Sequence, residues 1–249
     1  MDMLHYEEKY WSRGIENVAG IDEAGRGPLA GPVIASAVIL PHEVSLREVT
    51  DSKKLSEIKR ERLFDVIIST AMAVGIGIVH EWEIDKINIL QATYKAMQMA
   101  VRQLTVKPEI LLVDGRRADI KYFKQESIIK GDSKSLSIAA ASIIAKVTRD
   151  RMMINYDKVF PQYGFSGHKG YGSQKHIETI RTYLATPIHR QSFKPIPDHL
   201  PTLKYYKEKR LVGTLGEQLV ACSLIKDGCE IFEMNYNEFE LASNSVLLP

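Results

Sequence analysis

Residues 20–28 read Gly-Ile-Asp-Glu-Ala-Gly-Arg-Gly-Pro, so an apolar approach ends in two adjacent carboxylates and a glycine–arginine–glycine loop. Carboxylates are hard oxygen ligands of the kind that Mg²⁺ and Mn²⁺ prefer. Gly25 and Gly27 allow the backbone to approach a ligand closely, and the guanidinium of Arg26 offers a planar set of donors to phosphate. The stretch indicates phosphodiester chemistry at a metal site, although a strand that ends in an ordinary turn has the same composition.

Strand-like segments alternate with helical ones around this stretch. Runs rich in Val and Ile predict strands over 18–22, 33–40, 73–80, 110–115 and 127–130. Helices are expected to open at Ser56, to span 87–104 and to begin again at Ser133. The expected buried positions of the first two helices are Ile58, Leu63, Val66, Ile67, Ile87, Leu90, Tyr94, Met97, Val101 and Leu104. The alternation favours an α/β architecture.

Composition excludes several classes of protein. The 249 residues are 45% hydrophobic and 26% charged, which is typical of a globular protein. No apolar run reaches the ~18 residues that span a bilayer, and the first fifteen residues do not resemble a secretory signal. The two cysteines, Cys222 and Cys229, match no zinc or redox spacing. We therefore expect a protein of the reducing cytoplasm that does not associate with membranes.

Basic residues gather in one part of the chain. The net charge of +2 does not by itself indicate a nucleic-acid partner. From Lys121 to Lys175, however, ten Lys and Arg stand against four Asp and Glu, an excess of six. This range predicts a phosphate-binding surface, with an ordinary solvated helix surface as the alternative.

Four acids are candidates for one metal site: Asp22 and Glu23 end the first strand, Asp114 ends a later one, and Asp132 precedes a helix. Acids at strand ends lie on one rim of a sheet. Because successive strand residues point to opposite faces, Asp22 and Glu23 share a site only if the strand ends or bulges there. Each acid alone is equally typical of a cap or turn, and Asp132 in Gly-Asp-Ser resembles a helix N-cap.

Six motifs together resemble ribonuclease HII, in the order and spacing of that family, over residues 15–198. They are Gly20–Pro28, Asp51-Ser-Lys-Lys-Leu55, Val113-Asp-Gly115, Lys130-Gly-Asp132, Ala140-Ala-Ser-Ile-Ile-Ala-Lys-Val-Thr-Arg-Asp150 and Gly170-Tyr-Gly-Ser173. The resemblance implies an RNase-H-like fold, with a mixed β-sheet flanked by helices and a helical C-terminal part. It also implies an endonuclease that cuts 5′ of ribonucleotides in RNA–DNA hybrids and in duplex DNA, leaving a 3′-hydroxyl and a 5′-phosphate.

The resemblance also implies residue roles. Asp22, Glu23, Asp114 and Asp132 match catalytic acids that would hold two divalent cations, Mn²⁺ or Mg²⁺. Gly25, Arg26 and Gly27 match the family's ribose-reading loop, and Tyr171 matches a tyrosine that packs on the adjoining sugar. The candidate phosphate contacts are Lys53, Lys146, Arg149, Lys169 and Arg190. Arg149 is equally suited to a structural pair with neighbouring residues, and His168 and His176 are expected to be structural or to contact the backbone.

Residues 211–249 lie outside this resemblance. Leu215, Leu219, Cys222 and Ile225 predict the apolar side of a helix that ends at Gly228, and a short strand is expected over 230–236. The segment resembles the opening of a small restriction-endonuclease-like bacterial family, without the catalytic residues that follow there. We therefore expect a catalytic domain over 1–198, a linker over 199–210 and a truncated, inactive appendage over 211–249. These 39 residues are too few for a core of their own, so the appendage docks, pairs with a partner or stays mobile.

The sequence favours a monomeric metal-dependent endonuclease whose partners are RNA–DNA hybrids and ribonucleotide-containing duplex DNA, with a role in ribonucleotide removal. A binding module without catalysis is one alternative, and a scaffolding role carried by the appendage is another. The presence of all four acids argues against the binding module, because a protein that only binds nucleic acid does not need clustered carboxylates facing phosphate.

Overall fold

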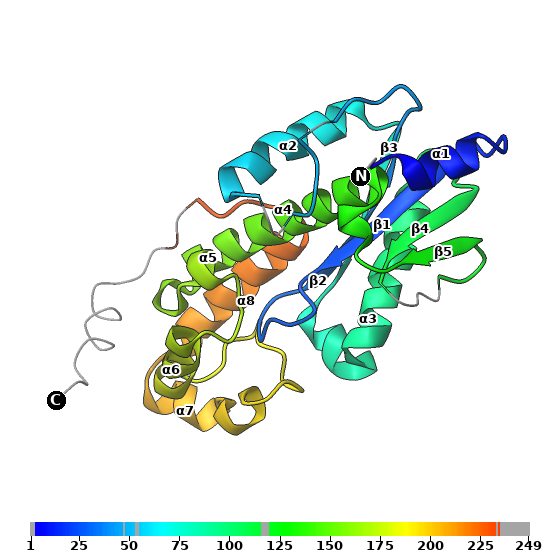
Figure 1. Ribbon diagram of the computed structural model, residues 1–249. Helices are drawn as coiled ribbons and strands as arrows, with labels where there is room; N and C mark the ends of the chain where they lie inside the picture. The colour runs from blue at the N-terminus through cyan, green and yellow to red at the C-terminus, as the bar shows by residue number, and fades with distance from the viewer. Residues whose placement is uncertain (1–2, 47, 53–54, 116–119, 233, 235–249) are drawn as a thin grey trace.

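The structure is a computed structural model that describes residues 3–46, 48–52, 55–115, 120–232 and 234 (Figure 1). Its strands are β1 (Val18–Ala24), β2 (Val33–Ile39), β3 (Ala73–Val79), β4 (Ile110–Asp114) and β5 (Gln125–Ile128). Its α-helices are α1 (His5–Trp11), α2 (Glu57–Thr70), α3 (Glu81–Gln103), α4 (Leu136–Val159), α5 (Phe165–His168), α6 (Gln174–Tyr183), α7 (Leu203–Glu208) and α8 (Val212–Lys226). None of the helices in the described part of the chain has the length and apolarity needed to cross a bilayer.

The five strands form one mixed sheet in the order β3-β2-β1-β4-β5. β1 pairs antiparallel with β2, and β2 antiparallel with β3. β4 pairs parallel with both β1 and β5. All five strands lie close to the predicted ranges, and the mixed sheet flanked by helices confirms the expected fold class. β1 runs two residues beyond its predicted end at Asp22, which bears on the site described below.

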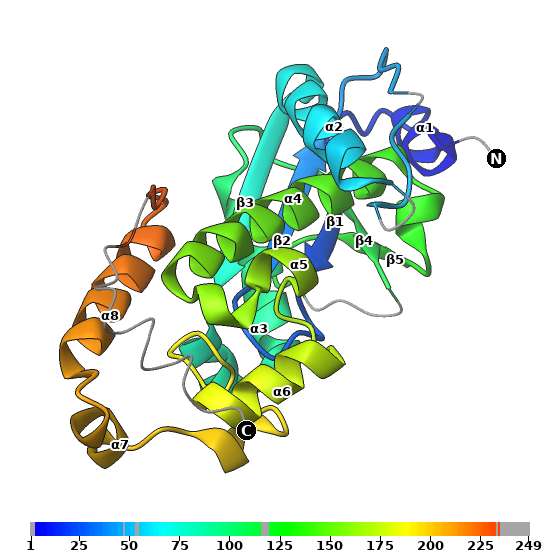
Figure 2. The ribbon, with the colours of Figure 1, turned by 90° about the vertical axis from the view of Figure 1, so that its left-hand side faces the viewer.

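Helices cover both faces of the sheet. α4 packs along β1 and β2, and α3 packs on β2 and β3 from the opposite face (Figures 1 and 2). Small residues allow the close approach on both sides. A Cβ atom on Gly20 would lie 2.1 Å from the carbonyl carbon of Ser137 in α4, and one on Gly77 would lie 1.9 Å from the carbonyl oxygen of Ala96 in α3. The sheet therefore accepts no larger residue at these two crossings.

The predicted buried faces of the first two helices were wrong in part. In α2, Leu63 and Ile67 are buried, but Ile58 is 84% exposed, and Val66 is exposed as well. α3 begins at Glu81 rather than at residue 87 and contains a break at Asn88, whose φ is 65°. Its buried face consists of Ile84, Ala92, Thr93, Ala96, Met97, Ala100 and Val101 with Glu81, while Leu90 is exposed. The small residues Ala96 and Ala100 form the part of this face that meets Gly75 and Gly77 of the sheet.

The start of α4 is fixed by a residue from the other end of the fold. The helix begins at Leu136, after a 3₁₀ turn over Gly131–Ser133, and Ser135 rather than Asp132 is its N-cap. Glu7 of α1 is fully buried there. Its Oε1 accepts hydrogen bonds from Ser135 Oγ at 2.6 Å, Ser137 Oγ at 2.6 Å and Ser137 N at 2.9 Å. A carboxylate at a helix N-terminus is favourably placed, so α1 holds α4 in position.

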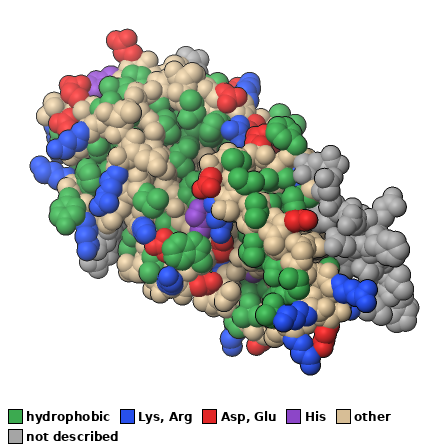
Figure 3. Space-filling model, turned by 180° about the vertical axis from the view of Figure 1, so that it is seen from behind, with side chains coloured by type: hydrophobic (Ala, Val, Ile, Leu, Met, Phe, Trp, Pro, Cys, Tyr) green, Lys and Arg blue, Asp and Glu red, His purple; other side chains and the backbone are tan. Residues whose placement is uncertain are grey.

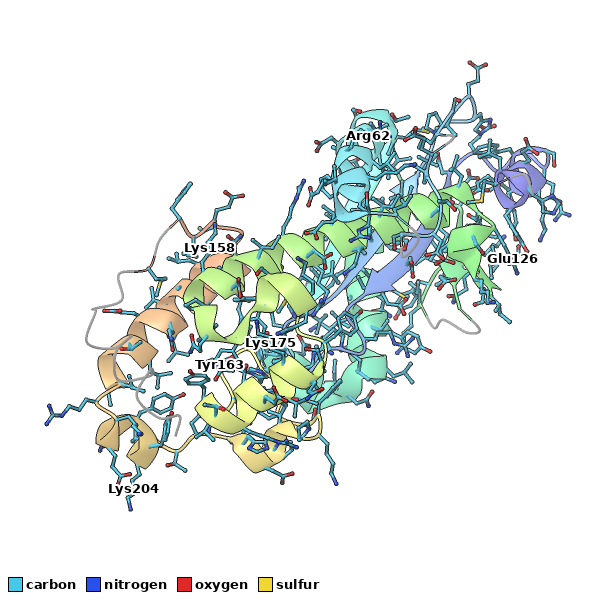
Figure 4. The ribbon with its side chains drawn as sticks, turned by 60° about the vertical axis from the view of Figure 1, so that its left-hand side comes forward. Arg62, Glu126, Lys158, Tyr163, Lys175 and Lys204 are labelled. Carbon is cyan, nitrogen blue, oxygen red and sulfur yellow. The ribbon has the colours of Figure 1, made fainter. Side chains whose placement is uncertain are left out.

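The C-terminal segment docks on the main body. Ala221, Cys222 and Ile225 of α8 are buried in the core cluster that includes residues of α4. Lys158 of α4 donates to the carbonyl of Ile231 at 2.6 Å (Figure 4). Lys226 forms an ion pair with the buried Glu81. Of the three alternatives expected for this segment, namely docking, pairing with a partner or mobility, α8 adopts docking.

Other expectations for this segment differ from the structure. The range 199–210, expected as a linker, contains the helix α7. Leu219, expected on the apolar side of α8, is 48% exposed. Residues 229–232 and 234 form no strand, and the remainder of the expected strand over 230–236 lies outside the described residues. The buried face of α8 is narrower than its sequence indicates, because only one edge of the helix meets α4.

We expect the Ile225→Ala variant to lower the free energy of unfolding by about 2 kcal/mol, since it deletes apolar contacts at a buried site. Ile225 is 2% exposed. The matched control is Leu219→Ala in the same helix, for which about 0.5 kcal/mol or less is expected. Urea denaturation of both variants checks this. Equal losses would mean that α8 does not dock through this face.

Candidate functional site

Two acids meet where the parallel strands β1 and β4 end. The register pairs Ile21 with Val113, so Asp22 and Asp114 follow at matching positions. Asp22 is 6% exposed. Burial raises its pKa well above the usual range, as do the negative charges of Glu23 and Asp114, while the Ser142 hydroxyl and the Glu23 N–H act in the opposite direction. The strand ends therefore concentrate negative charge at one point.

Glu23 joins this point without the expected end or bulge in the strand. Asp22, Glu23 and Ala24 pair regularly with Ser36, Ala35 and Ile34, so the predicted end of the strand at Asp22 was wrong and no bulge replaces it. The Glu23 side chain is half-buried and forms an ion pair with Arg26 at 3.2 Å. Its charge is nevertheless close enough to raise the pKa of Asp22. The length of a glutamate side chain at the rim of the sheet accounts for this reach.

Asp132 directly follows a residue that is hydrogen-bonded to Asp114. It is buried in the 3₁₀ turn after β5, and the neighbouring Gly131 N–H donates to Asp114 Oδ1 at 2.6 Å. Among the residues that the structure describes, no three Asp, Glu, His or Cys side chains already form a metal-binding group. The all-oxygen donor set and the uncompensated charge around Asp22 fit a hard divalent cation.

A cleft of about 210 Å³ adjoins Asp22, Glu23 and the glycine–arginine–glycine loop, whereas Asp114 and Asp132 are not among the residues that line it. It is lined by Asp22, Glu23, Ala24, Gly25, Arg26, Gly27, Ser52, Ser142, Lys146 and Tyr171. Ser52 and Ser142, whose hydroxyl groups are 2.8 Å apart, were not predicted to lie here. Ser52 lies in the motif Asp51–Leu55 and Ser142 in the motif Ala140–Asp150. Their place in these motifs was the only indication in the sequence that they belong to the site. The cleft thus brings predicted acids, loop and tyrosine together.

The loop presents its backbone donors away from the protein interior. Gly25 has a φ of +96°. The carbonyl oxygens of Gly25 and Arg26 accept hydrogen bonds from Arg190 Nη2 at 2.5 Å and Nη1 at 3.0 Å. In a trans peptide the N–H points opposite to the carbonyl, so the N–H groups of Arg26 and Gly27 point away from Arg190. Neither donates to another described residue, which leaves both for a ligand.

Arg149 and Arg190, predicted to contact phosphate, lie buried instead. Arg149 donates to the carbonyls of Pro32, Lys169 and Ala30 at 2.9–3.0 Å. Arg190 donates to Gly31 at 3.0 Å as well as to the loop. Burial lowers the pKa of Arg149 to about 10 and that of Arg190 to about 9. Both guanidinium groups hold backbone segments, so they do not face a substrate.

Of the remaining residues predicted to contact the substrate, some line the cleft and others do not. Lys146 lines the cleft and binds Asp150 Oδ1 at 2.7 Å. Lys169 is buried and binds Glu57 at 3.2 Å, while Lys53 lies outside the described residues. Tyr171 is 47% exposed. Its ring lies against Gly27, since a Cβ atom there would be 3.7 Å from Tyr171 Cε1.

Basic side chains do not form an uninterrupted surface on the face that lies behind the view of Figure 1. On the face seen from behind, Lys and Arg are interspersed with Asp and Glu (Figure 3). Lys146 and Lys169, both within the basic range 121–175, pair with Asp150 and Glu57. The local excess of charge in the sequence is therefore partly neutralised in the fold.

Two histidines support Tyr171 through a chain of hydrogen bonds. His176 Nδ1 lies 2.9 Å from the Tyr171 carbonyl, and its Nε2 lies 3.0 Å from His189 Nε2. Thr186 N donates to His189 Nδ1 at 2.9 Å. These partners assign the protons: His189 donates from Nε2, and His176 donates from Nδ1 to the carbonyl. His168 also binds the backbone, through the Tyr163 carbonyl at 2.8 Å, so His168 and His176 contact the backbone as expected.

We expect stability to fall as the pH drops below about 6.5, because both buried imidazoles must stay neutral. Burial lowers the pKa of His176 to about 4 and that of His189 to about 3, from 6.5. Below pH 6.5 the two histidines bind protons in the unfolded chain but stay unprotonated in the native protein. By pH 5 the loss is about 2 kcal/mol for each histidine.

Urea denaturation at pH 7.5, 6.5, 5.5 and 5.0 checks this expectation. His189→Asn should flatten the dependence on pH, while His5→Asn at an exposed position should leave it unchanged. A slope that His189→Asn does not alter would contradict the proton assignment.

Comparison with known proteins agrees with this geometry. The family model described as Ribonuclease HII matches residues 19–196. The ribonuclease HII of Acetivibrio thermocellus is 58% identical over 193 residues, covering 78% of this chain and 75% of its own length. That of Geotalea daltonii is 51% identical over 208 residues, covering 80% of this chain and 96% of its own.

Solved structures share the architecture. The ribonuclease H2 of Pyrococcus horikoshii superposes with a TM-score of 0.64 at 29% identity, covering 73% of this chain and 96% of its own. The ribonuclease HII of Archaeoglobus fulgidus, solved in complex with PCNA, gives 0.62 at 28% identity, with 76% and 98% covered. A Bst ribonuclease HIII solved with Mn²⁺ shares the fold at 16% identity and a TM-score of 0.56, with 83% and 70% covered. With its mixed sheet, its acids at the strand ends and these matches, the chain belongs to the ribonuclease HII family of endonucleases.

Proposed function

We propose that this enzyme hydrolyses the phosphodiester 5′ of ribonucleotides, in RNA–DNA hybrids and at single ribonucleotides in duplex DNA. The products are a 3′-hydroxyl and a 5′-phosphate. One observation carries the proposal: a single cleft is lined by the buried Asp22, by Glu23, by a loop whose Arg26 and Gly27 N–H groups point away from Arg190, and by the exposed Tyr171. The 2′-hydroxyl distinguishes ribose from deoxyribose, and N–H groups at a glycine loop suit an oxygen acceptor.

Asp22, Glu23, Asp114 and Asp132 are the residues that would hold two divalent cations, Mn²⁺ or Mg²⁺. When bound, such ions neutralise developing charge on phosphate and supply an activated water. The chain itself contributes orientation. Gly131 N–H fixes the Asp114 carboxylate, and Arg26 holds Glu23 at the rim of the cleft. Lys146 and Arg26, which both line the cleft, are the proposed phosphate contacts.

The proposed division of the chain assigns this activity to residues 1–198. The segment 211–249 contributes no second nuclease site, and its helix α8 instead stabilises α4 through Cys222 and Ile225. A fragment that ends at residue 198 should therefore keep the cleavage position while melting at a lower temperature.

The test is cleavage of an end-labelled DNA duplex that contains one ribonucleotide, with Mg²⁺ or Mn²⁺. Cutting immediately 5′ of the ribose, with an all-DNA duplex of the same sequence left intact, is the expected result. Cutting on the 3′ side, or equal cutting of both duplexes, would overturn the proposal. Tight binding without cutting under either metal would favour a binding module.

A further inference from the structure

A buried dipeptide, His189–Arg190, contacts both elements proposed to read ribose. Arg190 is 0% exposed and binds the carbonyls of Gly25 and Arg26. His189 is 2% exposed and binds His176, which in turn binds the carbonyl of Tyr171. Two adjacent residues thus reach the two sides of the cleft, the loop and the tyrosine, through side-chain hydrogen bonds alone.

The backbone around the dipeptide joins the same two elements. His189 forms a β-bridge with Ala30. Gly31 N donates to the Ile188 carbonyl at 2.9 Å, and Arg190 N donates to the Leu29 carbonyl at 2.8 Å. Leu29 N donates to the Gly170 carbonyl at 2.8 Å, which lies next to Tyr171. Segments 29–31, 170–171 and 188–190 therefore form one hydrogen-bonded unit beneath the cleft.

A carboxylate on α3 anchors this unit from the other side. Asp85 Oδ2 accepts from Gln191 N at 2.9 Å, and its Oδ1 accepts from Ser192 N at 2.9 Å and from Ser192 Oγ at 2.6 Å. Asp85 does not line the cleft. It fixes the backbone immediately after Arg190, so that the guanidinium approaches the loop from a defined direction.

We infer that His189 and Arg190 are positioning residues that set the spacing between the Gly25–Gly27 loop and Tyr171, and thereby the selectivity for ribose. The inference rests on the proposed function of this cleft. A hydrogen-bonding site for a single hydroxyl requires its groups to be held in place by supporting contacts. Arg190 orients the peptide planes of the loop. The hydrogen bonds from His189 through His176 fix the backbone of Tyr171 and thereby the position of its ring.

The first experiment measures binding without metal, so that it does not depend on activity. Two duplexes of the same sequence, one with a single ribonucleotide and one all-DNA, are titrated by fluorescence anisotropy in EDTA. For Arg190→Lys we expect unchanged affinity for the all-DNA duplex and about a tenfold loss of the ribose preference. Misplacement of the loop should also lower kcat/KM for the ribonucleotide duplex by about 100-fold.

Asp85→Asn is the second variant, because its half-exposed position puts folding less at risk. It should lower the ribose preference in the same direction but by less than Arg190→Lys. Arg151→Lys, a change at an exposed arginine paired with Glu61, is the matched control and should keep the wild-type preference. Thermal melting accompanies each variant.

The outcomes separate this inference from the proposed function. If the wild-type protein shows no ribose preference in either binding or cleavage, the proposed function fails. If the wild type shows the preference and folded Arg190→Lys and Asp85→Asn both retain it, the inference is wrong. Equal weakening of binding to both duplexes would also overturn it, because general destabilisation predicts that pattern.

Discussion

Asp22→Asn is expected to lower the rate of cleavage by about 10³-fold while leaving the metal-free protein at least as stable as the wild type. The loss of rate follows from removing a buried carboxylate at the point where charge must be neutralised. The gain in stability follows from removing a charge that is 6% exposed and surrounded by Glu23 and Asp114. Asparagine has nearly the same shape and carries no charge, so the repulsion is relieved.

Three measurements check this prediction: single-turnover cleavage, the melting temperature in EDTA, and the melting temperature with Mn²⁺. The wild type should melt higher when Mn²⁺ is added, and the variant should respond much less. Asp65→Asn, at an exposed position on α2, should behave as wild type in all three. A variant that melts well below the wild type in EDTA would mean that the Asp22 carboxylate stabilises the fold rather than the site.

Gly25→Ala is expected to reduce cleavage by about 100-fold and to destabilise the protein. A Cβ atom at this position would lie 2.2 Å from Arg149 Nε and 2.6 Å from the carbonyl oxygen of Pro32. The buried Arg149 cannot move aside without breaking its three hydrogen bonds to backbone carbonyls. The loop must shift instead, and a shift of about 1 Å at a reacting site can cost that factor.

Two other glycines separate the contributions to this effect. Gly14→Ala has open space and a φ of +75°, so it should show only the backbone strain, about 1–2 kcal/mol. Gly27→Ala meets only ordinary contact with Tyr171 and should leave the free energy of unfolding nearly unchanged. If Gly25→Ala destabilises no more than Gly14→Ala, the proposed collision with Arg149 does not occur.

The sequence predicted those features that local patterns determine. The short apolar runs predict the strands that carry Asp22 and Asp114, although β1 continues to Ala24. The loop at Gly25–Gly27 follows from its glycines. The roles of Arg149 and Arg190 were wrong because a buried arginine and a phosphate-binding one look alike in sequence. All of their carbonyl partners except Lys169 lie more than 100 positions away in the chain, as Gly25 does from Arg190.

The same reason applies to the helices and the histidines. On α3 the predicted Met97 and Val101 are buried, but Leu90 is not. Ala96 and Ala100 lie against Gly75 and Gly77 of a neighbouring strand, a contact that helical periodicity alone does not indicate. The chain from His189 to Tyr171 was missed, since nothing local marks two histidines thirteen positions apart as hydrogen-bonded. What the sequence leaves undetermined is the pairing of residues across the fold.

The contacts of Glu7 extend the folding unit beyond the residues that the family model matches. The family match covers residues 19–196, yet Glu7 at one end and Ile225 at the other are both buried against α4 or its cluster. α4 also carries Ser142 and Lys146 of the cleft. A recombinant fragment that spans only residues 19–196 would keep every proposed catalytic acid. It would lose the Glu7 carboxylate, which fixes the N-terminus of α4. The smallest piece of this protein fit for biochemical work therefore begins before α1.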